Sequence, residues 1–501
     1  MPSTPGLTTE EQRTADSHGP DRHSIISRLP VELLSEIFRW YVASAIFWHP
    51  FGQDWPPLIL THVCSSWRNI VMSLPRLWTQ VVIPSAHPCQ TPHDDCLHQC
   101  NDWLQRSFPH PVAVDFPCYN MSCMGSRLAI DVLAKHASRI TRLDLHLSEQ
   151  GDHCKVSMIT LFALPPGTFP VLTHLGLSVR FDIFRTGKVI TAFDQSPLRT
   201  LHLDYEPLMA VDSIRLEEIF KITWEGLEEL YMDPWPAYWP HGYTANASSF
   251  VIEHLRDIRV LGLTLPSTPS PHAVPPTVLP SRTAFPHMRT LRITLDNMLD
   301  LPVDDATTDH ALFQVFDLPA LEQITLLHTY QHRGREGMVS PTILSGLFED
   351  ADFIQTSLGR LRRLFVQDHG RIPDQKLLDV LEATPMLEEL QLWESMELRI
   401  PFYGRMASSS DLVPRLQTLR IHYADDESED VYEAMTRGVE VLLRGRWGEG
   451  KYGPDDEASV LKRMSATRGW PGSPGPRRKL EQAWVDAMEA LRPTGAGLHL
   501  R

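Results

Sequence analysis

A short pattern of apolar and polar positions, apolar-x-x-apolar-x-apolar, recurs along the chain from residue 140 onward. The last two apolar positions of each copy are separated by one outward position, which is the period of a β-strand. A weaker copy, PVAVDF, begins at Pro111. The ten clear copies, whose starts lie 26 to 40 residues apart, begin at Ile140, Leu172, Leu198, Leu227, Ile258, Met288, Leu321, Leu361, Leu387 and Leu416.

The segments between the copies contain helical candidates, and a single strand-helix unit cannot bury its own apolar face, whereas stacked neighbours share a continuous core. The repetition therefore predicts an α/β repeat solenoid with parallel strands and one helix per repeat. Residues 266–286 are too rich in proline for a helix or a central strand and are expected to form a loop. The helical candidates span residues 128–139, 213–222, 249–258, 340–359 and 375–382.

The repeat resembles the leucine-rich-repeat family. That family often places Asn or Cys three residues after the final apolar position, but this chain has Ser148, Arg180, Glu206 and Trp235 there. The resemblance therefore implies an irregular horseshoe with variable turns. In such a fold the outward strand residues line the concave face, and exposed aromatic and arginine side chains are common binding anchors. The expected substrate-binding residues are His202, Tyr231, Arg292, Phe365, Gln391, Trp393 and Arg420.

A separate apolar pattern with helical spacing lies near the N-terminus. Leu33, Leu34, Ile37 and Phe38 follow Leu29-Pro30 and form one stripe, with the proline at a helix start. The segment from Leu60 to Val71 repeats the stripe, and Cys64 and Trp67 within it are expected to lie in the core of a small all-α module.

This module resembles an F-box, on the motifs Leu29-Pro30, Leu33, Ile37-Phe38, Val63–Arg68 (VCSSWR) and Leu77-Trp78 in that order. The resemblance implies docking onto the Skp-type adaptor of a cullin-RING ubiquitin ligase through apolar residues that the module does not bury alone. Between the two helical halves, Ser44 to Pro57 depart from the family pattern. The adaptor-binding residues implied are Leu29, Pro30, Leu33, Leu34, Ile37, Phe38 and Trp67.

The composition of the chain argues against nucleic-acid and membrane partners. The 501 residues carry a formal charge of −16, which repels nucleic acid. The first residues lack the basic start and apolar middle of a signal peptide, and no apolar run has the roughly 20 residues needed to cross a bilayer. Seven cysteines, an odd number, fit a reducing compartment. We therefore expect a cytoplasmic or nuclear protein, or one in both compartments, without a nucleic-acid or membrane partner.

Catalytic and metal-binding motifs are incomplete. Residues 445–452 match the first part of a phosphate-binding loop, but Tyr452 replaces the Ser or Thr that would hold Mg²⁺. The dense histidines and cysteines between His87 and Cys100 contain no paired C-x-x-C unit. We expect no catalytic residue, no metal site and no cofactor.

The chain is thus expected to comprise an N-terminal tail (1–23), the helical module (24–84), the solenoid (85–425) and an acidic, Gly/Pro-rich tail (426–501) with a terminal helix that caps the solenoid or binds a partner. The function implied is that of a substrate receptor in an SCF-type ubiquitin ligase. Such a receptor binds the adaptor, is linked through the adaptor to the cullin, and binds a protein substrate, which is unknown here. The alternative is a non-ligase interaction scaffold whose helical module only caps the solenoid.

Overall fold

The protein is described from a computed structural model. The residues it describes are 29–44, 56–82, 93–118, 123–147, 160–179, 189–205, 220–234, 255–266, 282–297, 316–330, 351–367, 374–393, 400–409, 411–423, 437–438, 441–442 and 463–468. The predicted N-terminal tail, most of the 266–286 loop, the phosphate-loop-like segment and the terminal helix lie outside these residues.

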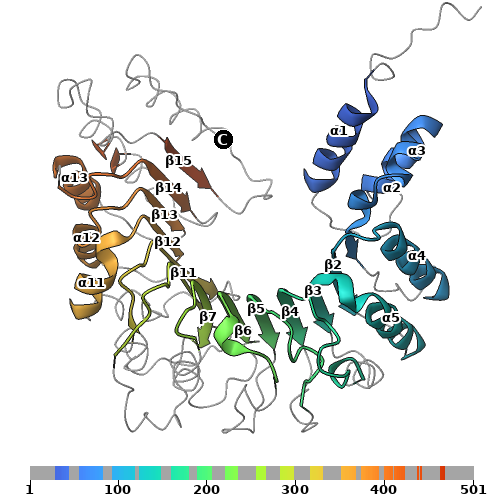
Figure 1. The fold of residues 1–501 in the computed structure, drawn as a ribbon. Helices are drawn as coiled ribbons and strands as arrows, with labels where there is room; N and C mark the ends of the chain where they lie inside the picture. The colour runs from blue at the N-terminus through green and yellow to red at the C-terminus, as the bar shows by residue number, and fades with distance from the viewer. Residues whose placement is uncertain are drawn as a thin grey trace, which may run out of the picture.

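The described chain forms a curved sheet of thirteen strands in which every neighbouring pair is parallel (Figure 1). Strands follow one another in chain order, so the sheet is a solenoid of successive repeats. A separate two-stranded sheet pairs β8 (Thr283–Ala284) with β10 (Phe316–Asp317). The thirteen strands are β1 (Gln80–Val82), β2 (Val112–Cys118), β3 (Ile140–Leu147), β4 (His174–Val179), β5 (Thr200–Tyr205), β6 (Glu229–Pro234), β7 (Val260–Pro266), β9 (Thr290–Asn297), β11 (Gln323–Tyr330), β12 (Arg363–Gln367), β13 (Glu389–Trp393), β14 (Thr418–Tyr423) and β15 (Arg463–Arg468).

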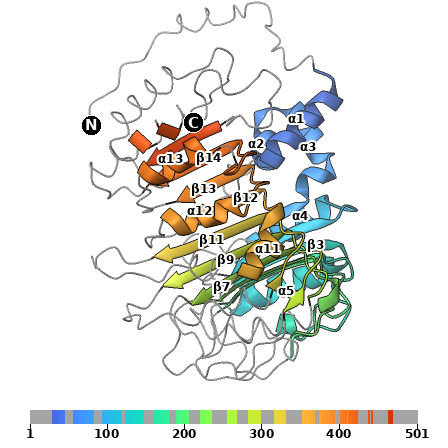
Figure 2. The same ribbon diagram turned by 90° about the vertical axis from the view of Figure 1, so that its left-hand side faces the viewer.

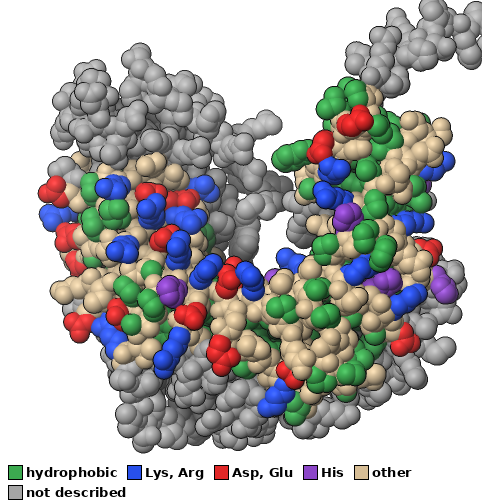
Figure 3. Space-filling model, in the orientation of Figure 1, with side chains coloured by type: hydrophobic (Ala, Val, Ile, Leu, Met, Phe, Trp, Pro, Cys, Tyr) green, Lys and Arg blue, Asp and Glu red, His purple; other side chains and the backbone are tan. Residues whose placement is uncertain are grey.

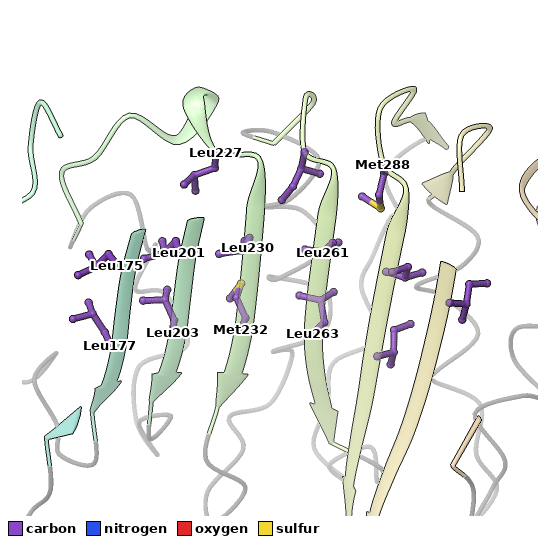
Figure 4. Close-up of a cluster of buried hydrophobic side chains, with 14 of the residues drawn as sticks. Leu175, Leu177, Leu201, Leu203, Leu227, Leu230, Met232, Leu261, Leu263 and Met288 are labelled. Carbon is purple, nitrogen blue, oxygen red and sulfur yellow. The ribbon is translucent and has the colours of Figure 1, made fainter. Parts of the chain in front are cut away.

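The apolar positions of the repeat build the core. In all ten predicted copies the three apolar side chains are at most 6% exposed. Leu175, Leu201, Leu230 and Leu261 lie side by side on consecutive strands. Figure 4 shows this ladder and a second one two residues further along, formed by Leu177, Leu203, Met232 and Leu263. The weaker copy from Pro111 is β2, with Val114 and the ring of Phe116 buried. The prediction of a parallel α/β repeat solenoid is confirmed.

Helices lie outside the curved sheet at its two ends (Figures 1 and 2). Between β4 and β11 the described residues contain the 3₁₀ turn η5 (Trp224–Gly226) and no α-helix. Most of the segments that join these strands lie outside the described residues, so one helix per repeat stays a prediction there. In the predicted helix 249–258, the described residues 255–258 form a turn, and in 213–222 Phe220 makes a β-bridge with Ile190. The outer helices are α4 (His93–Arg106), α5 (Cys123–His136), η3 (Ala137–Arg139), α11 (Ala351–Ser357), η7 (Leu358–Arg360), α12 (Asp374–Glu382) and α13 (Ile400–Ser408).

The N-terminal module contains α1 (Val31–Ser44), α2 (Pro56–Val63), α3 (Ser65–Met72) and the 3₁₀ turn η2 (Pro75–Trp78). The expected stripe from Leu60 to Val71 is split because Cys64 adopts an extended conformation. There its Sγ accepts a hydrogen bond from the Trp67 backbone N–H at 3.4 Å and caps α3. Cys64 is therefore exposed, contrary to the core position expected for it.

Three strands lie in ranges that the sequence patterns assign elsewhere. Strand β8 falls within residues 266–286, which were expected to form a loop. Strand β1 falls within the predicted helical module, yet it pairs with β2 and begins the solenoid sheet. Strand β15 falls within the predicted tail and extends the sheet beyond β14. The module and the solenoid therefore share a continuous backbone structure at residues 80–82.

Candidate interaction surfaces

Helix α1 has one buried and one exposed apolar face. Leu34, Phe38 and Val42 point into the module and are at most 8% exposed. On the opposite side, several large apolar side chains are 40 to 72% exposed. We call these residues the α1 outer face; they are Leu33, Ile37, Trp40 and Tyr41. Val31 is also 50% exposed, but it lies in the first turn, three residues before Leu34, and so shares the other side of the helix. Figure 3 shows hydrophobic side chains gathered over this end of the molecule.

The predicted adaptor-binding residues are divided between these two faces. Leu33 and Ile37 belong to the α1 outer face, and Pro30 is exposed just before the helix starts. Leu34 and Phe38 are buried within the module, so the expectation that they contact a partner is wrong for this conformation.

Trp67 of α3 is half-buried because its ring packs on Phe38, with the ring centroids 4.7 Å apart. Leu29 is also partly buried against the core. Trp40 and Tyr41 were missed, although they lie three and four residues after Ile37 and so share its helical face.

Leu77 and Trp78 fix the module to the solenoid. Trp78 is fully buried, and its Nε1–H donates to the carbonyl oxygen of Val71 at 3.1 Å. Its ring meets Trp103 of α4 edge to face with centroids 4.5 Å apart, and the Arg106 guanidinium lies 4.9 Å from its centroid. The module is thus anchored through η2, while the α1 outer face remains uncovered.

The second surface is the concave face of the sheet. One residue of each strand occupies the same register position along it, which we call the central row. Six of the seven predicted substrate-binding residues belong to this row. Trp393 lies on the next row, paired in register with His422. From β2 to β14 the central row reads Asp115, Asp144, Gly176, His202, Tyr231, Gly262, Arg292, Thr325, Phe365, Gln391 and Arg420.

The N-terminal half of the concave face carries carboxylates paired with histidines. His174 Nε2 lies 3.2 Å from Asp144 Oδ1, and Arg142 Nε donates to Asp144 Oδ2 at 2.7 Å. Burial alone would raise the pKa of Asp144, but the hydrogen bonds from His174 and Arg142 outweigh it and lower the pKa below its usual value. Asp144 is therefore ionised at neutral pH.

Asp233 repeats this arrangement three strands further on, in β6. His202 Nε2 lies 2.9 Å from Asp233 Oδ2, and the Thr264 hydroxyl donates to Asp233 Oδ1. Burial would raise the pKa of Asp233, but the hydrogen bonds from His202 and Thr264 prevail and lower it. These pairs fix the carboxylates in place while they remain charged.

Two glycines of the central row accommodate their neighbours' side chains. A Cβ at Gly262 would lie 2.5 Å from Cδ1 of Tyr231, so the tyrosine ring lies against the Gly262 backbone. A Cβ at Gly176 would collide with the Asp144 carboxylate in the same way. The outward pattern of the sequence did not indicate that these glycines position Tyr231 and Asp144.

The C-terminal half of the concave face is cationic and amphipathic. Arg292 and Arg420 are exposed on the central row, and Phe365 between them is half-buried. Arg420 Nη2 lies 3.5 Å from Glu389 Oε1, and the Gln391 amide donates to the same Glu389 oxygen at 2.6 Å.

The predicted absences of catalysis and metal binding remain expectations. In the described ranges, no three His, Cys, Asp or Glu side chains are arranged to hold a metal ion. Cys100 of the dense His/Cys stretch is buried in α4, whereas His87 and Cys89 lie outside the described residues. Over those same ranges, no helix has the length and apolar character to span a membrane.

No protein-family model matches the chain, and no curated protein matches it. Among solved structures, the chain is similar to the crystal structure of a TLR13–ssRNA13 complex, at 14% identity and a TM-score of 0.28. The match covers 66% of this chain and 42% of that chain, so the chain spans less than half the length of that protein. The parallel sheet itself, with its ladder of buried leucines, fits a leucine-rich-repeat type of fold.

Proposed function

We propose that this chain is a substrate-recognition subunit of an SCF-type cullin-RING ubiquitin ligase. The α1 outer face docks a Skp-type adaptor, which links the chain to the cullin, and the concave face binds a protein substrate. The chain supplies no catalytic group, metal or cofactor and acts in the cytoplasm, the nucleus or both. The ubiquitin-conjugating enzyme elsewhere in the complex performs the chemistry.

The observation that carries this proposal is that α1 has one apolar face buried in the module and a second apolar face exposed to solvent. The inner face of α1 and Trp78 complete the module and anchor it, yet Leu33, Ile37 and Trp40 stay 49 to 72% exposed. Clustered exposed apolar side chains of this kind are typical of protein-interaction sites. Leu33 and Ile37 also belong to the F-box-like motif in the sequence, which supports an adaptor as the occupant.

Burial of the α1 outer face would contribute free energy to a complex. An apolar side chain of this size is worth roughly 1.5–3 kcal/mol when it goes from exposed to fully buried. Leu33 and Ile37 are 52% and 49% exposed, so covering each contributes about half of that value, and loss of the two should weaken binding by about 10- to 150-fold.

The test is co-elution of the purified full-length chain with a purified Skp-type adaptor, with Kd measured by calorimetry. The double variant Leu33→Asp with Ile37→Asp changes only exposed side chains and should abolish co-elution. Val171→Asp with Val189→Asp is the matched control, because these valines are 38% and 41% exposed on the solenoid. Undiminished adaptor binding by the α1 double variant would overturn the proposal.

The Trp78 anchor also favours a second candidate, a non-ligase interaction scaffold whose module only caps the repeat sheet. Deleting residues 1–84 cannot separate the two functions, because the deletion removes Trp78 and β1 from the solenoid along with the α1 outer face. Under the scaffold function, the wild-type chain itself would not co-elute with the adaptor.

A further inference from the structure

The concave face is electrically polarised along the solenoid. On strands β2–β6 carboxylates occupy the central row and the rows two residues before and after it. The basic side chains in these three rows are Arg142 and three histidines. The carboxylates are those of Asp115, Asp144, Asp204, Glu229 and Asp233.

On strands β9–β14 the balance reverses. The same three rows carry Arg292, Arg363 and Arg420, all exposed, together with the carboxylate of Glu389. Glu389 already lies near Arg420. Arg292 and Arg363 are separated by the β11 strand alone and leave a cationic region there.

Aromatic rings lie within both halves. Tyr231 is held against the Gly262 backbone, and its ring centroid lies 5.7 Å from that of His202. Phe365 lies between the arginines of β9 and β14 on the central row. A ring on a charged surface offers a contact for aliphatic stems and for cations, which charge alone does not provide.

We propose that the concave face binds an extended polypeptide segment with separated charges, whose basic residues lie over β2–β6 and whose acidic residues lie over β9–β14. This inference rests on the proposed function and specifies its substrate class. Complementary potentials of this kind set orientation and specificity. Basic side chains would meet the ionised carboxylates and Tyr231, and acidic ones would meet Arg292 and Arg363.

The dimensions set the length of the segment. From β3 to β14 the order β3-β4-β5-β6-β7-β9-β11-β12-β13-β14 makes nine strand steps. At about 4.8 Å per step this spans about 43 Å, which an extended chain covers in roughly 13 residues. The segment therefore crosses the strands along the solenoid rather than adding a strand to an edge.

The test uses two labelled peptides of roughly 13 residues and identical composition, titrated against the full chain by fluorescence anisotropy. One has an arginine block, a Gly-Ser spacer and a glutamate block; the other has the same residues with arginine and glutamate alternating. Both are neutral overall, so general attraction to a chain of net charge −16 is the same for each.

The block peptide should bind at least about tenfold more tightly than the alternating peptide, and the difference should shrink as salt screens the charges. The double variant Arg292→Glu with Arg363→Glu should remove this difference in affinity between the two peptides. Arg256→Glu with Arg360→Glu is the matched control, since both arginines are exposed in turns outside the strands, and it should preserve the difference.

Equal affinity for the two peptides, no measurable binding of either, or a preference that survives the Arg292/Arg363 reversal would overturn the inference. The Leu33→Asp, Ile37→Asp variant separates this outcome from failure of the proposed function. It should lose the adaptor and keep the peptide preference, because the α1 outer face and the concave face share no residue.

Discussion

The Trp78 and Trp103 rings meet edge to face with their centroids 4.5 Å apart, and this contact joins the helical module to the first outer helix of the solenoid. Both indoles are at most 3% exposed. An edge-to-face pair adds stabilisation beyond the area that it buries. The module and the repeats should therefore unfold as one cooperative unit.

Trp78→Ala should lower the free energy of unfolding by about 3–5 kcal/mol, the usual cost of removing a buried aromatic side chain. Guanidinium unfolding followed by circular dichroism measures the loss. Trp40→Ala is the matched control, since Trp40 is 72% exposed, and it should change stability by no more than about 0.5 kcal/mol. Similar losses for the two variants would refute the anchoring role of Trp78.

His136 is held in its neutral form at the end of α5. Its Nδ1 lies 3.3 Å from Nη2 of Arg139, and because arginine only donates, this nitrogen carries no proton. Its Nε2 lies 3.2 Å from Asn101 Oδ1, to which it donates. Burial first, and then the positive charges of Arg139 and Lys135, lower the pKa of His136 from 6.5 to about 4.

This pKa predicts a loss of stability in mild acid. Between pH 6.5 and 4 the unfolded chain takes up a proton that folded His136 excludes, so the free energy of unfolding falls as the pH falls through this window. We expect roughly 1–2 kcal/mol, less than the full pKa difference implies, because solvent screens part of the effect.

The measurement compares unfolding at pH 7 and pH 4.5 for the wild-type chain and for His136→Gln. Glutamine can accept from Arg139 and donate to Asn101 without titrating, so the variant should lose less stability than the wild type in acid. His62→Gln, at an exposed position, serves as control and should behave like the wild type. Identical pH profiles for all three chains would contradict the assignment to His136.

The sequence predicted the structure best where a single physical requirement, the burial of one face of each strand, determines it. Every apolar position of the ten repeats is buried, because a strand in a stacked sheet has one face toward the core and one toward the concavity. The same alternation predicted six members of the central row. Pairing in register then places them on one line across neighbouring strands.

Sequence reasoning was less successful where two faces of one element compete. Leu33, Leu34, Ile37 and Phe38 form a single apolar stripe in the sequence, but α2 and α3 cover only the side of Leu34 and Phe38. The Cys64 cap that separates α2 from α3 depends on one extended residue within an apolar period. Strand β15 was missed because the sequence RMSATR lacks the leucines of the other repeats.

Gly262 and Tyr231 should show strong energetic coupling. In the wild-type chain, Gly262→Ala forces the Tyr231 ring from its position, since the new Cβ would lie 2.5 Å from Cδ1, and we expect a cost of about 1–3 kcal/mol. In a Tyr231→Ala background the space is free, and the same substitution should be neutral or stabilising by up to about 1 kcal/mol, because alanine loses less backbone entropy than glycine.

A double-mutant cycle measured by chemical unfolding gives the coupling energy between the two positions. Gly404→Ala in α13 is the matched control, because no atom lies within 4 Å of its added Cβ, and it should be stabilising with or without Tyr231. If Gly262→Ala costs the same in both backgrounds, Tyr231 does not rest on this glycine. The Tyr231 ring would then not be held where the concave face is proposed to bind a basic side chain.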